Sequence, residues 1–540
     1  MHSTISIPVS YEKRVHAKGA ALAWDAIRKV WTGRITGHSA FRIHEAGIPL
    51  PPSCDDLVAG FSYARGVLSG SESRDGVFSA ATYSHPGLPL FDHQKAAIAA
   101  ICATDAVFLA HEMGVGKTFA CVAAFDRLGG EAIKVLVLCP RSVAPVWRRE
   151  VAMHGAVPRR VVLLWEGSVA EKVKALRLQL DTAAATGEPV LAVINYESAW
   201  RQPMARLLLG EGWDVVVLDE SHRIKNHRSK IGKFSRELSF AARRRICLTG
   251  TPMPSNPLDL FGQMAFLDPS VFGLNYWEFR SKYAVMGGFD KKQVVAFRHL
   301  DELYERWGVM THRVCVDDVL DLPDATHVEI PVTLSSSASK TYRALEDSIA
   351  VQIAGGVITI TNALTQLLRA QQLVGGSLTT DDGTVVTVDD GKRQALVDFL
   401  ESLPTNEPVV VFCRFRADLA AVHAASTEVG RPSGELSGSR NELAVWQASG
   451  TDVLAVQIQS GGLGVDLSRA RYAVYYSLGF SLGDYLQSLA RIRRQGQTRK
   501  CFYYSLLAEL DDGAKTVDHI VRTALLRKEN VVGIVLAHFG

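Results

Sequence analysis

The sequence predicts an α/β protein built from two doubly wound parallel sheets. The first observation is length, because 540 residues with 47% hydrophobic side chains are enough for at least two cores. The second is a series of short, continuous apolar runs at residues 107–110, 135–139, 161–164, 191–194, 215–218 and 246–248. A comparable series follows at residues 409–413, 453–456, 472–476 and 501–506. Apolar strands separated by helix-favouring segments are typical of parallel sheets covered on both faces.

These two series divide the chain into three parts. We expect an N-terminal extension or accessory element at residues 1–85 and the first sheet domain at residues 86–320. The second sheet domain, with a helical insertion, is expected at residues 321–540. It would begin at the break Asp321-Leu322-Pro323, where proline interrupts regular structure.

Smaller elements are predicted from local patterns. The apolar spacing of residues 17–31 predicts a helix in the N-terminal part. Residues 335–350 and 358–373 are expected to be the helical insertion. Residues 375–391 are polar, with Gly and Asp at both ends of an alternating Thr/Val run, and predict a surface hairpin.

Composition restricts the class of protein only loosely. The formal net charge of +3 and the pI near 8.3 are compatible with nucleic-acid binding but do not argue for it, because a near-neutral total can conceal a basic groove. The eight cysteines are scattered without a C-x-x-C pair, so we expect small core residues in a reducing compartment. We see no secretory signal and no apolar run long enough to span a membrane, and we expect a cytoplasmic protein.

The stretch from His111 to Thr118 predicts a phosphate-binding loop. An apolar run precedes it, an Ala-rich run follows it, and Gly114 and Gly116 form the turn between them. Backbone N–H groups at such a turn and helix N-terminus favour a polyphosphate. Lys117 would neutralise the β- and γ-phosphates, and Thr118 would hold Mg²⁺. His111 stands where the strict G-x-x-x-x-G-K-[ST] pattern has Gly, and a bare G-x-G-K-T also occurs in ordinary loops before helices.

Two adjacent carboxylates end a predicted strand roughly 100 residues later, a spacing normal for a phosphate loop and its acidic partner strand. Asp219 would complete the Mg²⁺ site, and Glu220 would polarise the attacking water as general base. The alternative is that Asp219 or Ser221 only caps the N-terminus of a helix.

Two arginines near the end of the second domain predict a contribution to the same chemistry. Arg491 and Arg494 are three residues apart, so on a helix they share a face and could pair with phosphate oxygens across a cleft. Arginines of this kind supply transition-state charge in phosphoryl transfer. The alternative is a solvated basic helix end that stops at Gly496.

Several blocks in fixed order also make residues 88–528 resemble a known family. In the first domain they are LFDHQ at 90–94, CPRS at 139–142 with Trp147 and Glu150, NYE at 195–197, DESHRIKN at 219–226 and TGTP at 249–252. In the second they are VLDLP at 319–323, VFCRF at 411–415, QSGGLGVDL at 459–467 and QSLARIRRQGQ at 487–497. The chain resembles the Swi/Snf-type branch of superfamily-two helicase-like ATPases.

The resemblance implies two RecA-like lobes that hydrolyse ATP with Mg²⁺ and track along double-stranded DNA. It implies that Gln94 reads the adenine. It further implies that DNA is coupled to the ATP site by Thr249, Thr251, Gly462, Gly464 and Gln487. For the threonines and glycines, the alternative is ordinary turn chemistry.

The chain departs from the family pattern at three of the motif positions. His111 replaces the usual Asp, Ser221 replaces Ala or Gly, and Asp466 stands where many members have Asn. None of these changes removes a catalytic group. We see no long tails or histone-reading extensions, and we therefore expect a compact bacterial or bacteriophage member.

Three functions remain open from the sequence. The first is a translocase that remodels protein–DNA or branched DNA structures, and the second is a strand-separating helicase. The third is a DNA-binding clamp with a vestigial ATP site. The clamp is disfavoured because the chain retains every charged group that hydrolysis needs, namely Lys117, Asp219, Glu220, Arg491 and Arg494.

Overall fold

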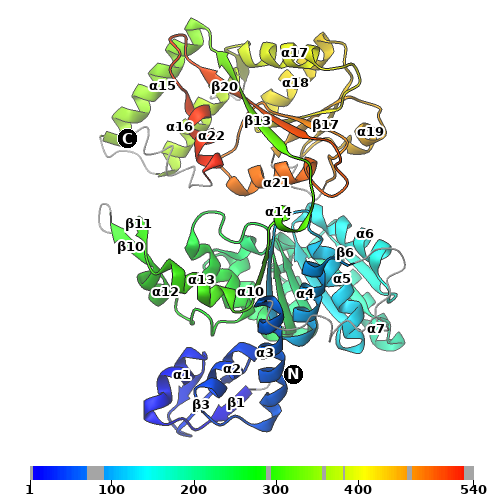
Figure 1. Cartoon of the computed structure of the whole chain (residues 1–540), viewed down its shortest axis with the longest axis vertical. Coiled ribbons are helices and arrows are strands. Elements are labelled where there is room, and N and C mark those ends of the chain that lie inside the picture. The colour runs from blue at the N-terminus through cyan, green and yellow to red at the C-terminus, as the bar shows by residue number, and fades with distance from the viewer. Residues whose placement is uncertain are drawn as a thin grey trace. The chain divides into compact units, whose positions relative to one another are not determined.

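The structure is a computed structural model that describes residues 4–69, 90–287, 293–354, 360–380, 384–458 and 465–527. The chain divides into two compact units, Met1–Leu320 and Asp321–Gly540 (Figure 1). Each unit contains one large parallel sheet, so the predicted fold class is confirmed.

The sheet of the first unit has seven strands, all parallel, in the order β12-β4-β9-β8-β5-β7-β6. Its strands are β4 (Ala106–His111), β5 (Lys134–Cys139), β6 (Arg160–Leu164), β7 (Val190–Asn195), β8 (Trp213–Asp219), β9 (Ala242–Leu248) and β12 (Thr311–Val314). All but β12 contain one of the predicted apolar runs. A separate hairpin pairs β10 (Ala284–Gly287) with β11 (Gln293–Phe297).

Helices cover both faces of this sheet, as Figure 1 shows for α5 and α13. They are α4 (Asp92–Ala103), α5 (Lys117–Leu128), α6 (Ala144–His154), α7 (Val169–Thr186), α8 (Tyr196–Ala199), α9 (Met204–Gly210), α10 (Lys230–Leu238), α11 (Leu260–Leu267), α12 (Tyr276–Tyr283), α13 (Leu300–Gly308) and α14 (Val316–Val319). Successive strand residues alternate between two cores: Val107 and Leu109 pack under α4 and α5, whereas Phe108 packs on the opposite face. Within the described ranges, no helix combines the length and apolarity needed to cross a bilayer.

The N-terminal element is a small α/β layer within the first unit. It contains β1 (Thr4–Ile7), α1 (Arg14–Gly19), β2 (Ala23–Asp25), β3 (Val30–Arg34), α2 (Gly37–Glu45) and α3 (Asp55–Ser69), with an antiparallel sheet in the order β1-β3-β2. The helix predicted at residues 17–31 is therefore wrong. Ala21 and Lys29 adopt positive φ angles of 59° and 54°, which end α1 and turn the chain between β2 and β3.

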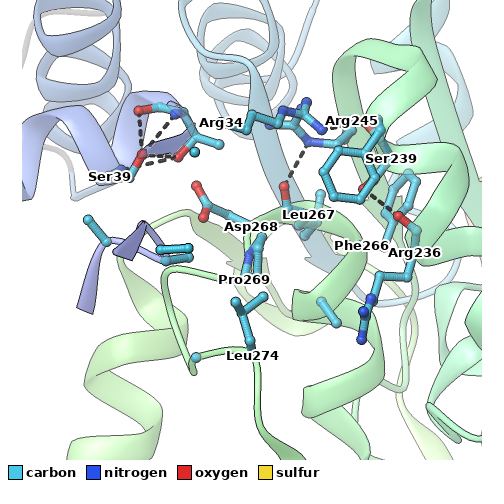
Figure 2. Close-up of a pocket in the computed structure, with 18 of the residues that line it drawn as sticks. Arg34, Ser39, Arg236, Ser239, Arg245, Phe266, Leu267, Asp268, Pro269 and Leu274 are labelled. Carbon is cyan, nitrogen blue, oxygen red and sulfur yellow. Dashed lines mark hydrogen bonds between the residues drawn. The ribbon is translucent and has the colours of Figure 1, made fainter. Parts of the chain in front are cut away.

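Polar contacts fasten this element to the sheet domain. Arg34 donates to the Ser239 carbonyl oxygen at 2.6 Å, and the Asp105 carboxylate accepts from the Gly37 N–H at 3.0 Å. Burial and the nearby Asp268 carboxylate raise the pKa of Asp105 to about 6. A cavity of about 250 Å³ remains between the two parts. Figure 2 shows the cavity with Asp268 in its centre and Arg34 and Arg245 along one wall.

The sheet of the second unit has six strands, again all parallel, in the order β13-β20-β19-β16-β18-β17. These strands are β13 (Ala325–Thr333), β16 (Val409–Cys413), β17 (Ser433–Leu436), β18 (Val453–Gln457), β19 (Tyr472–Tyr475) and β20 (Cys501–Glu509). Its helices are α15 (Ser336–Ala354), α16 (Ile360–Val374), α17 (Gly391–Ser402), α18 (Arg416–Glu428), α19 (Leu443–Gln447), α21 (Leu482–Ile492) and α22 (Val517–Leu526). The helices predicted at residues 335–350 and 358–373 are confirmed, within the described residues, by α15 and α16. The hairpin is confirmed by β14 (Ser377–Thr379) and β15 (Val385–Thr387), which are antiparallel.

Candidate functional site

The phosphate loop joins the end of β4 to the start of α5. Gly114 and Gly116 adopt φ angles of 87° and 85°, which other residues reach only with strain, and α5 begins at Lys117. A β-carbon at Gly116 would lie 2.4 Å from the Gln94 amide nitrogen, so any other residue there would also displace the Gln94 side chain. The predicted order of strand, glycine turn and helix is thus observed at the expected residues.

Lys117 and Thr118 occupy the first turn of α5, where free backbone N–H groups favour an anion. The Lys117 ammonium donates to the carbonyl oxygens of His111 and Glu112, at 2.8 and 3.0 Å. These bonds hold the side chain across the loop rather than in solvent.

Gln94 connects α4 to the same loop. Its amide oxygen accepts from the Phe91 N–H at 3.1 Å, and its nitrogen donates to the Val115 carbonyl oxygen at 3.3 Å. The side chain is buried, so its orientation is set by these two backbone groups. This places the sequence-predicted glutamine directly against the phosphate loop.

Asp219 is the last residue of β8, and side chains from α6 and α8, the helices that follow β5 and β7, hold it in place. Trp147 of α6 donates its indole N–H to Asp219 Oδ2 at 2.9 Å, and the Tyr196 hydroxyl of α8 donates to the Asp219 carbonyl oxygen at 2.8 Å. Burial and the adjacent Glu220 carboxylate raise the pKa of Asp219 to about 6. The carboxylate is positioned by tertiary contacts, and the helix-cap alternative does not describe it.

Glu220 adopts a left-handed backbone conformation, with φ at 56°, and 13% of its side chain is exposed. Its Oε2 accepts from the Thr249 hydroxyl at 3.1 Å and lies 3.3 Å from His222 Nδ1. Burial alone would raise the pKa of Glu220. The hydrogen bond and charge of His222, followed by the charge of Lys117, outweigh burial and lower this pKa to about 2. Glu220 is therefore ionised at neutral pH.

The residues present fit a divalent cation between α5 and β8. The Lys117 charge acts on both Asp219 and Glu220, and burial together with the Asp219 charge raises the pKa of the Cys121 thiol in the second turn of α5. Lys117 and Cys121 of α5 therefore lie near the carboxylates, and Thr118 follows Lys117 in the first turn of the same helix. Adjacent carboxylates with a nearby hydroxyl form an oxygen donor set of the kind that Mg²⁺ prefers.

Thr249 and Thr251 of the TGTP block extend the Glu220 cluster. The Thr249 hydroxyl accepts from the Thr251 N–H at 3.1 Å and lies 3.1 Å from His222 Nδ1. Thr249 follows β9, which lies between β4 and β8 in the sheet. The turn after β9 is therefore in direct contact with the carboxylate expected to face the attacking water.

Two departures from the family pattern are accommodated in buried positions. His111 Nε2 lies 2.9 Å from Nδ1 of His312 on β12, with the ring of His93 6.1 Å away. Burial, followed by the His312 and Lys117 charges, lowers the pKa of His111 well below its usual value. Ser221 is fully buried and donates to the Gln263 side chain at 2.7 Å.

In the second unit, the expected shared helix face of the two arginines is wrong. Arg491 lies in the last turn of α21, which ends at Ile492, whereas Arg494 lies in the turn that follows. The break occurs because Arg493 leaves the helical conformation, with ψ at 88°. Arg494 instead contacts the preceding motif, donating to the Val465 carbonyl oxygen at 3.4 Å and lying 3.9 Å from Asp466.

The remaining predicted coupling residues have different outcomes. Gln487 is buried on α21. Gly462 and Gly464 lie outside the described residues. Sequence reasoning gave no role in the site to Trp147, Tyr196 or His222. Only their place in the family-like blocks pointed to these three residues. Trp147 and Tyr196 contact Asp219, which is distant from both in sequence, so local patterns could not reveal these contacts.

The fold and the site define a class: a two-unit α/β protein with a glycine-rich phosphate loop and a carboxylate pair at a strand end. Comparison with family models identifies the family. The SNF2-related domain matches residues 93–374, and the helicase conserved C-terminal domain matches residues 391–496. The chain belongs to the SNF2-related family and has the helicase-like ATPase domains of that family.

Individual relatives are distant. The chain is 25% identical over 449 residues to "CHD3-type chromatin-remodeling factor PICKLE" of Arabidopsis thaliana, covering 74% of this chain and 31% of the relative. It is 27% identical over 435 residues to protein p41 of Acyrthosiphon pisum secondary endosymbiont phage 1, covering 76% and 89%. The "Sulfolobus solfataricus SWI2/SNF2 ATPase core in complex with dsDNA" matches with 22% identity and a TM-score of 0.39, covering 82% of this chain and 91% of that one. The chain thus spans about a third of PICKLE and most of the phage protein.

Proposed function

We propose that this protein hydrolyses ATP with Mg²⁺ and uses the energy to translocate along double-stranded DNA. The observation that carries the proposal is the connected group at the ends of β4, β8 and β9. There the phosphate loop, the carboxylate pair and the TGTP block are joined by the Lys117 charge and by the Thr249–Glu220 hydrogen bond. Family membership supports the choice of a helicase-like motor over other phosphate-loop enzymes.

The chain's residues have separate tasks in the proposed reaction. Gln94 would hold the adenine, while Gly114, Gly116 and Lys117 would bind the β- and γ-phosphates. Thr118 and Asp219 would hold Mg²⁺, which offsets phosphate charge when bound.

Glu220 would orient and polarise the attacking water. Its low pKa makes it a weak proton acceptor, but phosphoryl transfer through a loose transition state depends more on water position than on base strength. The hydrogen bond from Thr249 and the contact with His222 fix the direction in which the carboxylate points.

Arg491 and Arg494 would supply transition-state charge from the second lobe. Hydrolysis would then require the lobes to close, and each closure would move one lobe along the DNA. Thr249 and Thr251 would transmit DNA contact to Glu220, and the fifth-motif glycines Gly462 and Gly464 would act with Gln487 on the other lobe. The partner is DNA contacted through its phosphates, so sequence preference should be weak.

The alternatives make different predictions in a displacement experiment. A translocase should release a third strand from a triplex on a blunt duplex in an ATP-dependent reaction, without separating a forked duplex. A strand-separating helicase should open the fork, and a clamp should do neither while still binding DNA. Glu220→Gln is the blank, and absence of triplex release by the wild type would refute the translocase.

A further inference from the structure

The segment from Tyr11 to the β2–β3 turn exposes several large apolar side chains that are close together in sequence. Four such side chains are at least half exposed: Tyr11 at 75%, Val15 at 70%, Trp24 at 50% and Ile27 at 94%. The same N-terminal element buries other apolar residues, among them Ile7, Ala17 and Leu22, in a compact core. Large apolar side chains that lie exposed near one another are typical of a binding surface.

The charge around these side chains is predominantly positive. The exposed basic residues of the segment are Arg14, Lys18, Arg28 and Lys29, and the exposed acidic residue among the described positions 11–29 is Glu12. Asp25 is largely occupied within its own turn, where it accepts from the Ile27 and Arg28 N–H groups, both at 3.0 Å. The surface therefore complements an anionic partner.

Aromatic and basic groups are interleaved in space as well as in sequence. Arg14 stacks over the Tyr11 ring, with 3.5 Å between the guanidinium carbon and the ring centre. Trp24 pairs with Trp31 across β2 and β3, and their ring centres are 5.8 Å apart. Only three residues separate α1 from β2.

Strand register places Trp24 on the same side of the small sheet as α1. Trp24 pairs with Trp31, which pairs with Ile7, and directly paired residues point to the same face. Ile7 shares a core with Ala17 of α1. Helix α1 and Trp24 therefore lie on the same side of this sheet. We call the exposed side chains of this segment the N-terminal face: Tyr11, Arg14, Val15, Lys18, Trp24, Ile27, Arg28 and Lys29.

We propose that the N-terminal face binds single-stranded DNA that adjoins the duplex on which the motor acts. Exposed aromatic rings stack on unpaired bases, which a duplex does not present, while arginine and lysine contact the phosphates. The inference rests on the proposed function for its assumption that DNA is the substrate. The contacts of Arg34 and Asp105 hold the element against the first sheet domain, so this face has a fixed position on the ATPase lobe.

The test compares two DNA probes on the full-length chain without nucleotide: a blunt duplex, and the same duplex with a single-stranded tail. The wild type should bind the tailed probe about tenfold more tightly, because stacking one base on an aromatic ring is worth roughly that factor. Trp24→Ala should lose this preference, and Trp24→Phe should retain most of it. Binding of the blunt duplex should be unchanged by either substitution.

A second variant avoids the core altogether. Arg28→Gln combined with Lys29→Asn alters the exposed turn, and Asn tolerates the positive φ at position 29. It should lower the salt dependence of tailed-probe binding, by roughly 0.7 in log–log slope for each phosphate that the variant no longer neutralises. Lys174→Ala and Leu178→Ala, at exposed positions of α7, are the matched controls and should change neither property.

Equal binding of the two probes by the wild type would overturn the proposal and point to a protein partner for this face. So would a preserved tail preference in Trp24→Ala together with an unchanged salt dependence in the double variant at Arg28 and Lys29. A different measurement tests the proposed function: it is wrong if blunt duplex does not stimulate ATP hydrolysis. Variants of the N-terminal face should keep wild-type turnover at saturating blunt duplex.

Discussion

The two lobes present their predicted catalytic residues in contrasting ways. In the first lobe, Asp219 and Glu220 follow a buried central strand and are fixed by side chains from three other segments. In the second lobe, Arg494 lies in a turn beyond a helix, partly exposed, and contacts Val465 and Asp466 of the glycine-rich motif. The proposed function accordingly takes the first lobe as the preformed part of the site, and the second-lobe arginines as groups that would reach their position during the reaction.

Removal of the phosphate-loop ammonium should have the largest effect. Lys117→Ala should lower ATP turnover by about 10³-fold or more, because a charge aimed at the phosphates is lost in a preformed site. Lys134→Ala, which removes an ion pair with Glu211 elsewhere on the same lobe, is the control and should leave turnover near wild type. Steady-state phosphate release measures both, and substantial activity in Lys117→Ala would disprove the site.

Removal of the second-lobe arginine should separate binding from chemistry. Arg494→Ala should lower turnover by about 10³-fold while nucleotide affinity stays close to wild type, since the group acts on transition-state charge. Fluorescent-nucleotide titration and turnover should be measured on the same preparation. Arg499→Ala, which removes an ion pair with Glu407, is the control. Normal hydrolysis by the Arg494 variant would show that the finger assignment is wrong.

The preformed character of the first lobe is tested by a smaller change. Trp147→Phe keeps the ring and removes the hydrogen bond to Asp219, so the Mg²⁺ concentration for half-maximal turnover should rise about tenfold. Trp213→Phe removes an equally short bond, to the Leu208 carbonyl oxygen, at the other end of β8 and should not alter the Mg²⁺ requirement. Equal behaviour of the two variants would mean that Asp219 is not held by Trp147 for metal binding.

The buried His111 predicts the smallest effect, on stability rather than turnover. The pKa of His111 is lowered in the folded protein. Below pH 6.5 the unfolded chain therefore takes up a proton that the folded chain does not, and the free energy of unfolding decreases as the pH falls. Between pH 7.5 and 5.5 the wild type should lose about 1.4 kcal/mol more than His111→Asn. Unfolding of both proteins and of the control His16→Asn should be followed at the two pH values, and an identical acid response of the wild type and His111→Asn would contradict the assignment.

Much of the fold could be predicted from sequence because interior parallel strands are continuous apolar runs. The strands that were missed in the two large sheets, β12, β13 and β17, all lie at sheet edges. Edge strands are half solvated, so their sequences contain polar residues, and β13 even contains Pro331. The N-terminal sheet was missed because its apolar residues happen to have helical spacing. The pairing of β2 with β3, which brings Trp24 and Trp31 together, cannot be seen in that spacing.

The candidate site was predictable where its chemistry is local. Lys117 and the glycines before it belong to one turn, and Asp219 ends a strand, so spacing alone was sufficient to predict where they lie in the fold, while their catalytic roles stay predictions. The contacts of Trp147 with Asp219 and of His111 with His312 join segments far apart in the chain, and only the sheet order brings them together. The prediction that Arg491 and Arg494 share a helix face is wrong because a single backbone rotation at Arg493 ends α21.

The proposed function requires a DNA-stimulated ATPase that uses residues of both lobes. The most direct test is the rate of ATP hydrolysis with no nucleic acid, single-stranded DNA, blunt double-stranded DNA or RNA, with Glu220→Gln as the blank. Strong stimulation by blunt duplex, little by RNA and none in the blank is the predicted result. Absence of hydrolysis under every condition, with DNA binding retained, would contradict the account and favour a DNA-binding clamp.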